Sequence, residues 1–178
     1  MARHPDTTAA TPDEFRAFMR HWPTGVSVVT SHDHGAPVGC TVNALMSVSL
    51  SPPLLVVALG KASTTLGAIR ATGVFGVNVL AAEQRELCRR FAHGSQRDRF
   101  HGLSYRMLRR LPVLAGALVG SGCVATDITT HGDHALVFGQ PQWYTVDEVG
   151  SPLVFHERAF HDLARTGEVA TCRPTPSR

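Results

Sequence analysis

The stretch GCTVNALMSVSLSPP, from Gly39 to Pro53, decides the fold class of this sequence. Its short hydrogen-bonding side chains Thr41, Asn43, Ser47 and Ser49 all stand at odd positions. Successive side chains of a β-strand point to opposite faces, so these residues are expected on one face of one long strand that spans 38–51. The even positions are apolar and are expected to face the core: Val42, Ala44, Met46, Val48 and Leu50. A polar face without lysine or glutamate suits a polar ligand lying against the strand. A face that only meets solvent is the alternative.

Further along the chain, the pattern predicts a mainly β protein. Strands are expected at 25–31, 54–60, 73–80, 113–129, 134–146 and 152–155, between turn residues. Helices are expected at 11–22, 63–71, 81–92 and 158–164, and the polar stretch 93–102 is expected to be a surface loop. Many strands with few short helices predict a closed or half-open β-barrel with peripheral helices. The alternative, a doubly wound parallel sheet, needs long helices between successive strands, and only 81–92 approaches one.

The first helix has the clearest start signal. Thr11 is a candidate N-cap, Pro12 fits the first helical position, and Glu14 can reach back to the cap. One face of this helix is apolar and carries Phe15, Phe18, Met19 and Trp22. Further on, the polar sequence SHDHG at 31–35 predicts a solvated hairpin turn.

The length of 178 residues predicts one domain, 11–165, between disordered tails at 1–10 and 166–178. The longest apolar runs have about ten residues and a membrane span needs about 20, so no membrane helix is expected. The N-terminal residues show no apolar stretch of the signal-peptide type, which makes the cytoplasm the expected location.

The charge pattern argues against nucleic acid as a partner. The formal net charge is +3, the basic residues are dispersed, and aromatic residues make up only 7% of the chain. Nucleic-acid-binding proteins usually show a concentrated basic face and aromatic stacking platforms. A small anionic ligand explains the modest positive net charge equally well. The four cysteines form no CxxC pair, which excludes zinc-finger and thioredoxin-like sites and predicts free thiols.

Three short motifs have simpler explanations than the chemistry they resemble. GSGCVA, Gly120 to Ala125, is spelled like a dinucleotide-binding turn, but β-forming residues follow where a helix is needed, so a strand is expected. His131 and His134 resemble a metal-binding pair, but metal sites usually need three or more convergent ligands, and no metal is expected. GVSVV lacks the closing glycine of a nucleophile elbow, which excludes a serine hydrolase of that type.

The chain as a whole resembles a known family. The matching segments, in order, are FMRHWPTGVSVVTS, GCTVNALMSVSLSPPLLVVAL, STTLGAIRATGVFGVNVLAAEQRELCRRFA and GDHALVFGQ. They are similar to the flavin reductase family that serves two-component monooxygenases. The resemblance implies a split β-barrel, a homodimer, and an NAD(P)H:flavin oxidoreductase that uses NADH or NADPH to reduce FMN or FAD for a partner monooxygenase. Two alternatives stay open: a non-catalytic flavin carrier, and a ligand-binding or oligomerising barrel without flavin affinity.

The resemblance also implies site residues. Flavin-binding positions on the polar strand are Gly39, Thr41, Asn43, Ala44, Ser47, Val48 and Ser49. The turn near the flavin phosphate is implied at Ser63 and Thr65, and a second flavin segment at Phe75, Asn78, Val79, Leu80 and Gln84. The nicotinamide side is implied at Pro23, Thr24, Gly25, Gly132, Asp133 and His134. His134 is expected to orient the carboxamide or supply a proton. Ala44 replaces the serine of many members and Gln140 an apolar residue, so the flavin preference stays open.

The implied reaction is hydride transfer from the nicotinamide to flavin N5. The cofactors carry this chemistry, and the protein aligns the two rings. Backbone N–H groups between Thr41 and Ser49 are expected to stabilise the negative charge of reduced flavin.

Overall fold

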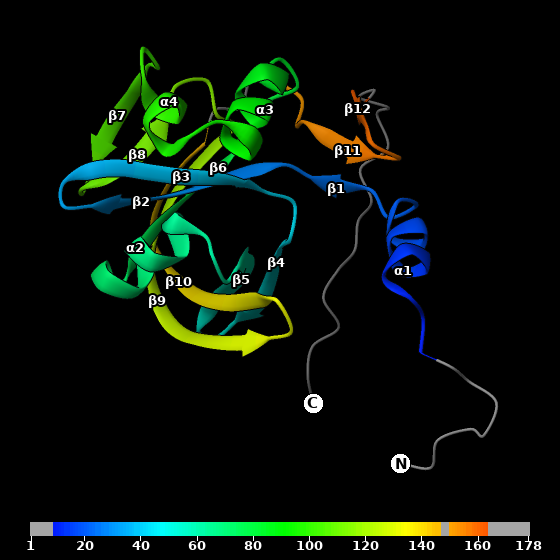
Figure 1. Cartoon of the computed structure of the whole chain (residues 1–178). Helices are drawn as coiled ribbons and strands as arrows, with labels where there is room; N and C mark the ends of the chain where they lie inside the picture. Colours follow the sequence, from blue (N-terminus) through cyan, green and yellow to red (C-terminus); the bar gives the residue numbers. More distant parts are fainter. Residues whose placement is uncertain (1–8, 147–149, 164–178) are drawn as a thin grey trace.

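The computed structural model describes residues 9–146 and 150–163 and is dominated by one seven-stranded sheet (Figure 1). The strand order in this sheet is β3-β2-β6-β9-β10-β5-β4. The strands are β1 (Thr24–Gly25), β2 (Ser27–Asp33), β3 (Ala36–Val42), β4 (Leu45–Leu50), β5 (Pro53–Gly60), β6 (Val74–Val79), β7 (Tyr105–Leu108), β8 (Leu111–Leu114), β9 (Val119–His131), β10 (His134–Val146), β11 (Val154–His156) and β12 (Ala159–His161). The helices are α1 (Pro12–Met19), α2 (Thr64–Thr72), α3 (Arg85–His93) and α4 (Gln96–Phe100). Each strand pairing between these elements is antiparallel, which excludes the doubly wound parallel sheet.

The sheet curls into a half-open barrel because its two edge strands follow each other in the chain. β3 lies at one end of the strand order and β4 at the other, yet only Asn43 and Ala44 separate them in sequence. The long hairpin β9-β10 bends through the molecule and connects the two halves of the sheet (Figure 1). We call the junction at Asn43 and Ala44 the seam. The predicted mainly β, split-barrel fold with peripheral helices is confirmed.

The interior of the barrel is an apolar core. α2 contributes Leu66 and Ile69, which pack with Val57, Phe75 and Val137 from three strands of the sheet. Each of these side chains has no exposed surface. Burial of one such side chain stabilises a fold by about 1.5–3 kcal/mol, so this cluster fixes α2 against the sheet.

Two helices behave as their local sequence predicts. α1 begins with the expected capping box, in which Thr11 and Glu14 satisfy each other's backbone groups. α2 begins at the expected cap Ser63 and ends at Gly73, whose φ of 71° is the left-handed conformation that glycine adopts readily. The apolar face of α1 stays largely exposed within the described chain, and this helix has no buried residue.

The strand predicted at 38–51 is wrong as one element. The chain leaves β3 at Val42 and starts β4 at Leu45, so the two halves pair with different strands and do not share one face. Val42 is buried as expected. The other even positions are exposed instead of facing the core: Ala44 before β4, and within β4 Met46 at 62%, Val48 at 43% and Leu50 at 89%.

Two further predictions are wrong. The stretch 93–102, expected to be a loop, contains α4, which Ser95 caps and whose Phe100 packs edge-on against Phe91. The helix expected at 158–164 is replaced by β12, because Glu157 and Arg158 both adopt positive φ and turn the chain back along β11. Positive φ at both central residues is the geometry of a tight hairpin turn.

The predicted tails lie outside the described residues, apart from Ala9 and Ala10, which belong to no helix or strand. GSGCVA lies within β9, as expected. Among the helices in the described ranges, none combines the length and hydropathy that a membrane crossing requires.

Candidate functional site

The seam of the barrel opens into a cavity of about 250 Å³. It is lined by Cys40, Thr41, Val42, Asn43, Ala44, Ala58, Leu59, Gly60, Ser63 and His134. Polar groups at a few points of a mostly apolar concave wall are typical of small-molecule sites. The cavity therefore brings together predicted flavin residues from β3, the seam and the start of α2 with the predicted nicotinamide residue His134.

The polar residues on the seam side differ in which of their hydrogen-bonding groups are unpaired. The Thr41 hydroxyl donates to the carbonyl oxygen of Cys88 over 2.7 Å, which ties β3 to α3 and leaves only the acceptor capacity of Thr41. Asn43 is exposed, and its amide has no hydrogen-bond partner within 9–146 and 150–163. This amide can therefore both donate to and accept from a ligand.

The start of α2 forms a second polar corner of the cavity. The Ser63 hydroxyl oxygen accepts the N–H of Leu66 over 3.4 Å and so caps the helix. Two residues further along, Thr65 is fully buried beside Cys40 and does not line the cavity. The N–H groups of a first helical turn are unpaired and attract anions. The cap residue Ser63 and these N–H groups fit a phosphate group at this end of the cavity.

His134 reaches the cavity from the opposite side. Gly132, with φ of 59°, turns β9 into β10, and the pairing of His134 with Gly60 brings the imidazole beside the end of β5. The His134 Nδ1 and Asp133 Oδ1 are 2.8 Å apart. This hydrogen bond holds the pKa of the Asp133 carboxyl below its usual value. The same hydrogen bond orients the imidazole ring of His134.

Several predicted flavin residues lie outside this cavity. Ser47, Val48 and Ser49 stand on the exposed edge strand β4. Gly39 is engaged elsewhere, with its N–H on Gln96 and its carbonyl oxygen on Arg99.

The second predicted flavin segment is interior structure. Phe75, Asn78 and Leu80 have at most 1% of their surface exposed. The Asn78 amide is consumed by the protein: it donates to Val28 and Pro112 and accepts the N–H of Leu114 over 2.9 Å. These three side chains have no surface for direct contact with a flavin, because β6 lies between β2 and β9 inside the sheet. Val79 ends the same strand, half-buried, and its carbonyl oxygen accepts the N–H of Leu118.

The side chain of Gln84 likewise forms hydrogen bonds within the protein. Its side chain accepts the N–H of Ala81 and donates to the carbonyl of Ala115, which closes the turn before α3.

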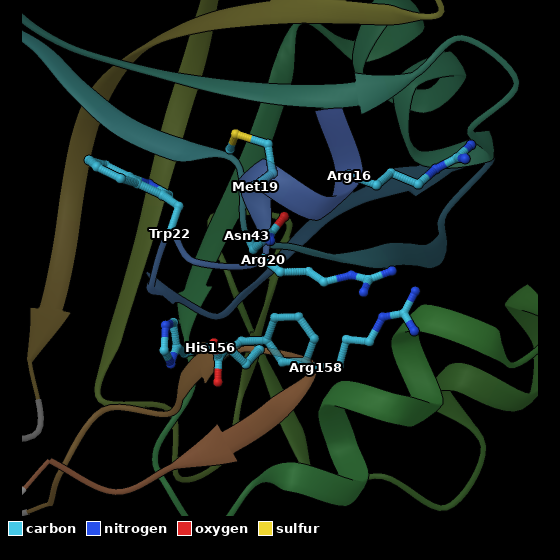
Figure 2. Close-up of a pocket in the computed structure, with 9 residues that line it drawn as sticks. Arg16, Met19, Arg20, Trp22, Asn43, His156 and Arg158 are labelled. Atoms are coloured by element: carbon cyan, nitrogen blue, oxygen red, sulfur yellow. The ribbon is translucent and has the colours of Figure 1, made fainter. Parts of the chain in front are cut away.

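The residues Pro23, Thr24 and Gly25 lie on the far side of the seam, where β1 pairs with β11. The Thr24 hydroxyl is buried and has no partner in the described part of the chain. Next to this segment is a second cavity of about 350 Å³, shown in Figure 2. It is lined by Arg16, Met19, Arg20, Trp22, Asn43, Phe155, His156, Glu157 and Arg158. Asn43 belongs to both cavities, so they adjoin at the seam.

The sequence model of the family described as "Flavin reductase like domain" matches residues 19–164. The chain belongs to this flavin reductase family. The resemblance stated from the sequence motifs is confirmed. The match includes every element from β1 to β12 and therefore the whole seam.

Named relatives of this flavin reductase family member include a "Flavin reductase" of Pseudomonas putida, 35% identical over 88% of this chain and 93% of the relative. A "Flavin reductase (NADPH)" of Lentzea aerocolonigenes is 40% identical over 84% of this chain and 89% of the relative. Among solved structures, the Streptomyces globisporus NADH:FAD oxidoreductase SgcE6 in complex with NAD and FAD fragments aligns with a TM-score of 0.82 and 29% identity. That alignment covers 91% of this chain and 100% of SgcE6.

Sequence reasoning missed part of the cavity wall. Ala58, Leu59 and Gly60 line it only because β5 pairs with β10 beside the seam, which no local pattern reveals. Cys40 also lines it, and burial raises the pKa of this thiol, so it stays protonated at neutral pH. No three His, Cys, Asp or Glu side chains converge as a metal site in the part of the chain that the structure covers.

Proposed function

We propose that this flavin reductase binds its flavin in the seam cavity and receives the nicotinamide on the His134 side. One observation carries the proposal: a single cavity joins the free amide of Asn43, the start of α2 and the imidazole of His134. When bound, the flavin supplies the hydride acceptor N5, and NADH or NADPH supplies the donor C4. The expected enzyme class and cofactors, an NAD(P)H:flavin oxidoreductase using FMN or FAD, agree with the names of the relatives.

Different side chains along the cavity have different roles in binding. Asn43 holds a polar ring edge through an amide that can donate and accept. The first turn of α2, with its cap residue Ser63, holds the phosphate. His134 orients the carboxamide of the nicotinamide while Asp133 holds its ring. Correct alignment of two rings supplies a large part of the rate of such a transfer.

Three finer assignments remain part of the proposal. The chain forms a homodimer, which is supported by the exposed apolar side chains of β4 and α1. It delivers reduced flavin to a monooxygenase, which is supported by the name of a 34% identical relative of Rhodococcus jostii, "Flavin-dependent monooxygenase, reductase subunit HsaB". The cytoplasmic location stays a prediction from the sequence.

The test is a cuvette assay with purified protein. NADH or NADPH absorbance is followed with FMN, with FAD and without flavin, together with direct flavin titration. Oxidation that depends on added or bound flavin is the expected result. Flavin binding without NAD(P)H oxidation would instead establish a flavin carrier, and absence of both would leave only a barrel that binds something else.

A further inference from the structure

The outer edge of β3 is closed by side chains instead of by a neighbouring strand. β3 stands at the end of the strand order, so β2 pairs with it on one side only. A strand edge of this kind leaves backbone N–H and C=O groups without ladder partners. At Gly39, the side-chain oxygen of Gln96 accepts the N–H over 3.2 Å, and Nη1 of Arg99 donates to the carbonyl oxygen over 2.6 Å. Both backbone groups of Gly39 are therefore satisfied by α4.

The side chain of Arg99 is itself fixed in place. Its Nε donates over 2.8 Å to the carbonyl oxygen of Gly94, the residue that follows α3, and Arg99 is half-buried. Figure 1 shows α3 and α4 together beside β3, and both helices contact this strand. The guanidinium group thus joins three segments: the end of α3, α4 and the edge of β3.

Close packing over Gly39 excludes a side chain at this position. A Cβ atom there would lie 3.0 Å from the ring of Phe91 and 3.0 Å from the carbonyl oxygen of Val29. Glycine therefore lets α3 lie directly on the strand. Two residues further along, the Thr41 hydroxyl donates to the carbonyl oxygen of Cys88 in the same helix. Gly39 does not line the seam cavity, so its contacts are with α3 and α4.

The residue that α4 holds directly precedes the cavity wall. Cys40, Thr41, Val42 and Asn43 line the seam cavity in unbroken sequence. This wall is therefore supported by β2 on one side and by α3 and α4 on the other. The charge of Arg99 also acts on the wall: burial raises the pKa of the Cys40 thiol, and the positive charge of Arg99 opposes that rise.

We propose that Gln96 and Arg99 are positioning residues of the flavin site, which hold β3 at Gly39 so that residues 40–43 meet the flavin in one fixed arrangement. This rests on the proposed function, because that function puts the flavin in the seam cavity. A wall that is already ordered costs less conformational entropy when a ligand binds. Release of the β3 edge adds the cost of ordering the wall to flavin binding. The nicotinamide side at His134 belongs to β10, which α4 does not hold.

The test compares wild type with three variants and one control. Arg99→Gln removes the guanidinium donor to Gly39, and Gln96→Leu removes the acceptor of its N–H. Arg99→Lys keeps a cation that can donate to the same carbonyl oxygen. The control is Arg97→Gln, an exposed arginine of the same helix that does not line the seam cavity. Circular dichroism identifies the folded proteins, and Gln96→Leu decides the outcome if Arg99→Gln does not fold.

Flavin titration and steady-state kinetics measure the effect on the site. We expect the flavin dissociation constant to rise about tenfold in Arg99→Gln and about threefold in Gln96→Leu, because the charge-assisted hydrogen bond is the stronger one. Arg99→Lys should recover part of the loss, and Arg97→Gln should match wild type. The KM for NADH or NADPH at saturating flavin should not change. Unchanged flavin affinity of the folded variants, or an equal loss in Arg97→Gln, overturns the proposal.

Hydrogen exchange without flavin tests the hold on β3 directly. The amides of residues 38–43 should exchange several-fold faster in Arg99→Gln and Gln96→Leu than in wild type, while those of β5 and β10 keep their rates. Unchanged exchange of residues 38–43 overturns the proposal.

Failure of the proposed function gives a different result, because the exchange measurement needs no ligand. A wild type that binds neither FMN nor FAD would refute the function and with it the role of α4 in flavin binding. Faster exchange in the two variants would still establish that Gln96 and Arg99 hold the edge of β3.

Discussion

The two asparagines of the chain occupy opposite environments, and this difference separates a proposed ligand contact from a structural residue. Asn43 is exposed at the seam, where it lines both cavities. Asn78 is 1% exposed and is hydrogen-bonded on both sides of its amide.

We expect Asn43→Ala to weaken flavin binding by several-fold to about tenfold, because one or two hydrogen bonds are worth about 0.5–1.5 kcal/mol each. Its melting temperature should match that of wild type. Asn78→Ala is the contrast: it leaves the Leu114 N–H unsatisfied in the interior and should cost about 2–4 kcal/mol of unfolding free energy. Flavin titration and thermal melts of both variants provide the check. An unchanged flavin affinity of a folded Asn43→Ala protein would remove Asn43 from the site.

His134 is expected to act on the nicotinamide rather than on stability. Its side chain is 52% exposed and hydrogen-bonds only to the neighbouring Asp133 in the described chain. His134→Ala should raise the KM for NADH or NADPH about fivefold to tenfold and leave flavin affinity nearly intact. The matched control is His131→Ala, since His131 pairs with His134 across the turn but does not line the cavity. Equal kinetics for the two variants would exclude the nicotinamide role.

Cys123 provides a pH-dependent test of the core. Its side chain is 1% exposed in β9, and burial raises its pKa to about 11. A thiol whose pKa is higher in the folded than in the unfolded chain contributes stability below the unfolded pKa, and this stability is lost as pH rises through about 11. We expect the stability of wild type to fall between pH 9 and 11 by at most about 3 kcal/mol from this group. Cys123→Ala lacks that loss, so the gap between the two melting temperatures should narrow over this range. A constant gap would mean that burial does not raise the pKa of this thiol above its value in the unfolded chain.

At the scale of elements, close packing fixes where β9 and β10 can bend. A Cβ atom at Gly122 would lie 2.3 Å from the ring of Trp143, and Trp143 pairs with Gly122 where the β9-β10 register shifts. The glycine is therefore required by the indole that crosses it, as expected for a glycine inside a strand.

Gly122→Ala should destabilise the protein by about 1–3 kcal/mol, because the Trp143 ring must move to make room. The control is Gly67→Ala on the exposed face of α2, where nothing lies within 4 Å of the added methyl group. That substitution should stabilise the protein by about 0.5–1 kcal/mol, since alanine favours a helix. Chemical denaturation of both variants measures the difference. Equal effects would show that Trp143 does not restrict Gly122.

At the scale of the whole molecule, the apolar surface that the described chain leaves open predicts a homodimer. Leu50 of β4 is 89% exposed and Phe18 of α1 is 68% exposed, and β4 is an edge strand. Exposed apolar patches and open strand edges of this kind are usually covered by a partner. We expect light scattering to give twice the 19.2 kDa chain mass at micromolar concentration.

The double variant Leu50→Glu with Phe18→Glu should then be a folded monomer, since two charges cannot be buried without partners. Met107→Glu is the control, because Met107 is exposed and belongs to β7, a strand that lies away from β4 and α1 in Figure 1. A wild-type monomer, or a double variant that stays dimeric, would contradict the predicted interface.

The sequence by itself determined the local features of this flavin reductase and its family. The capping box at Thr11 and Glu14, the cap at Ser63 and the turn at His34 and Gly35 all stand where the pattern predicts them. These features depend on hydrogen bonds between residues a few positions apart, which a short pattern encodes. The mainly β fold class follows from the alternation of polar and apolar residues, and the family follows from the order of its motifs.

The tertiary structure alone decided the break at Asn43, the interior position of Asn78, the Ala58 to Gly60 wall and the second cavity. Each of these depends on pairing between distant segments, such as His134 with Gly60, or Arg20 with the turn at Glu157. The alternation of polar and apolar residues in 38–51 would be the same for one long strand and for two strands at opposite edges of the sheet. Only closure of the barrel decides between them, because closure is set by the register of distant strands and not by the residues of the strand itself.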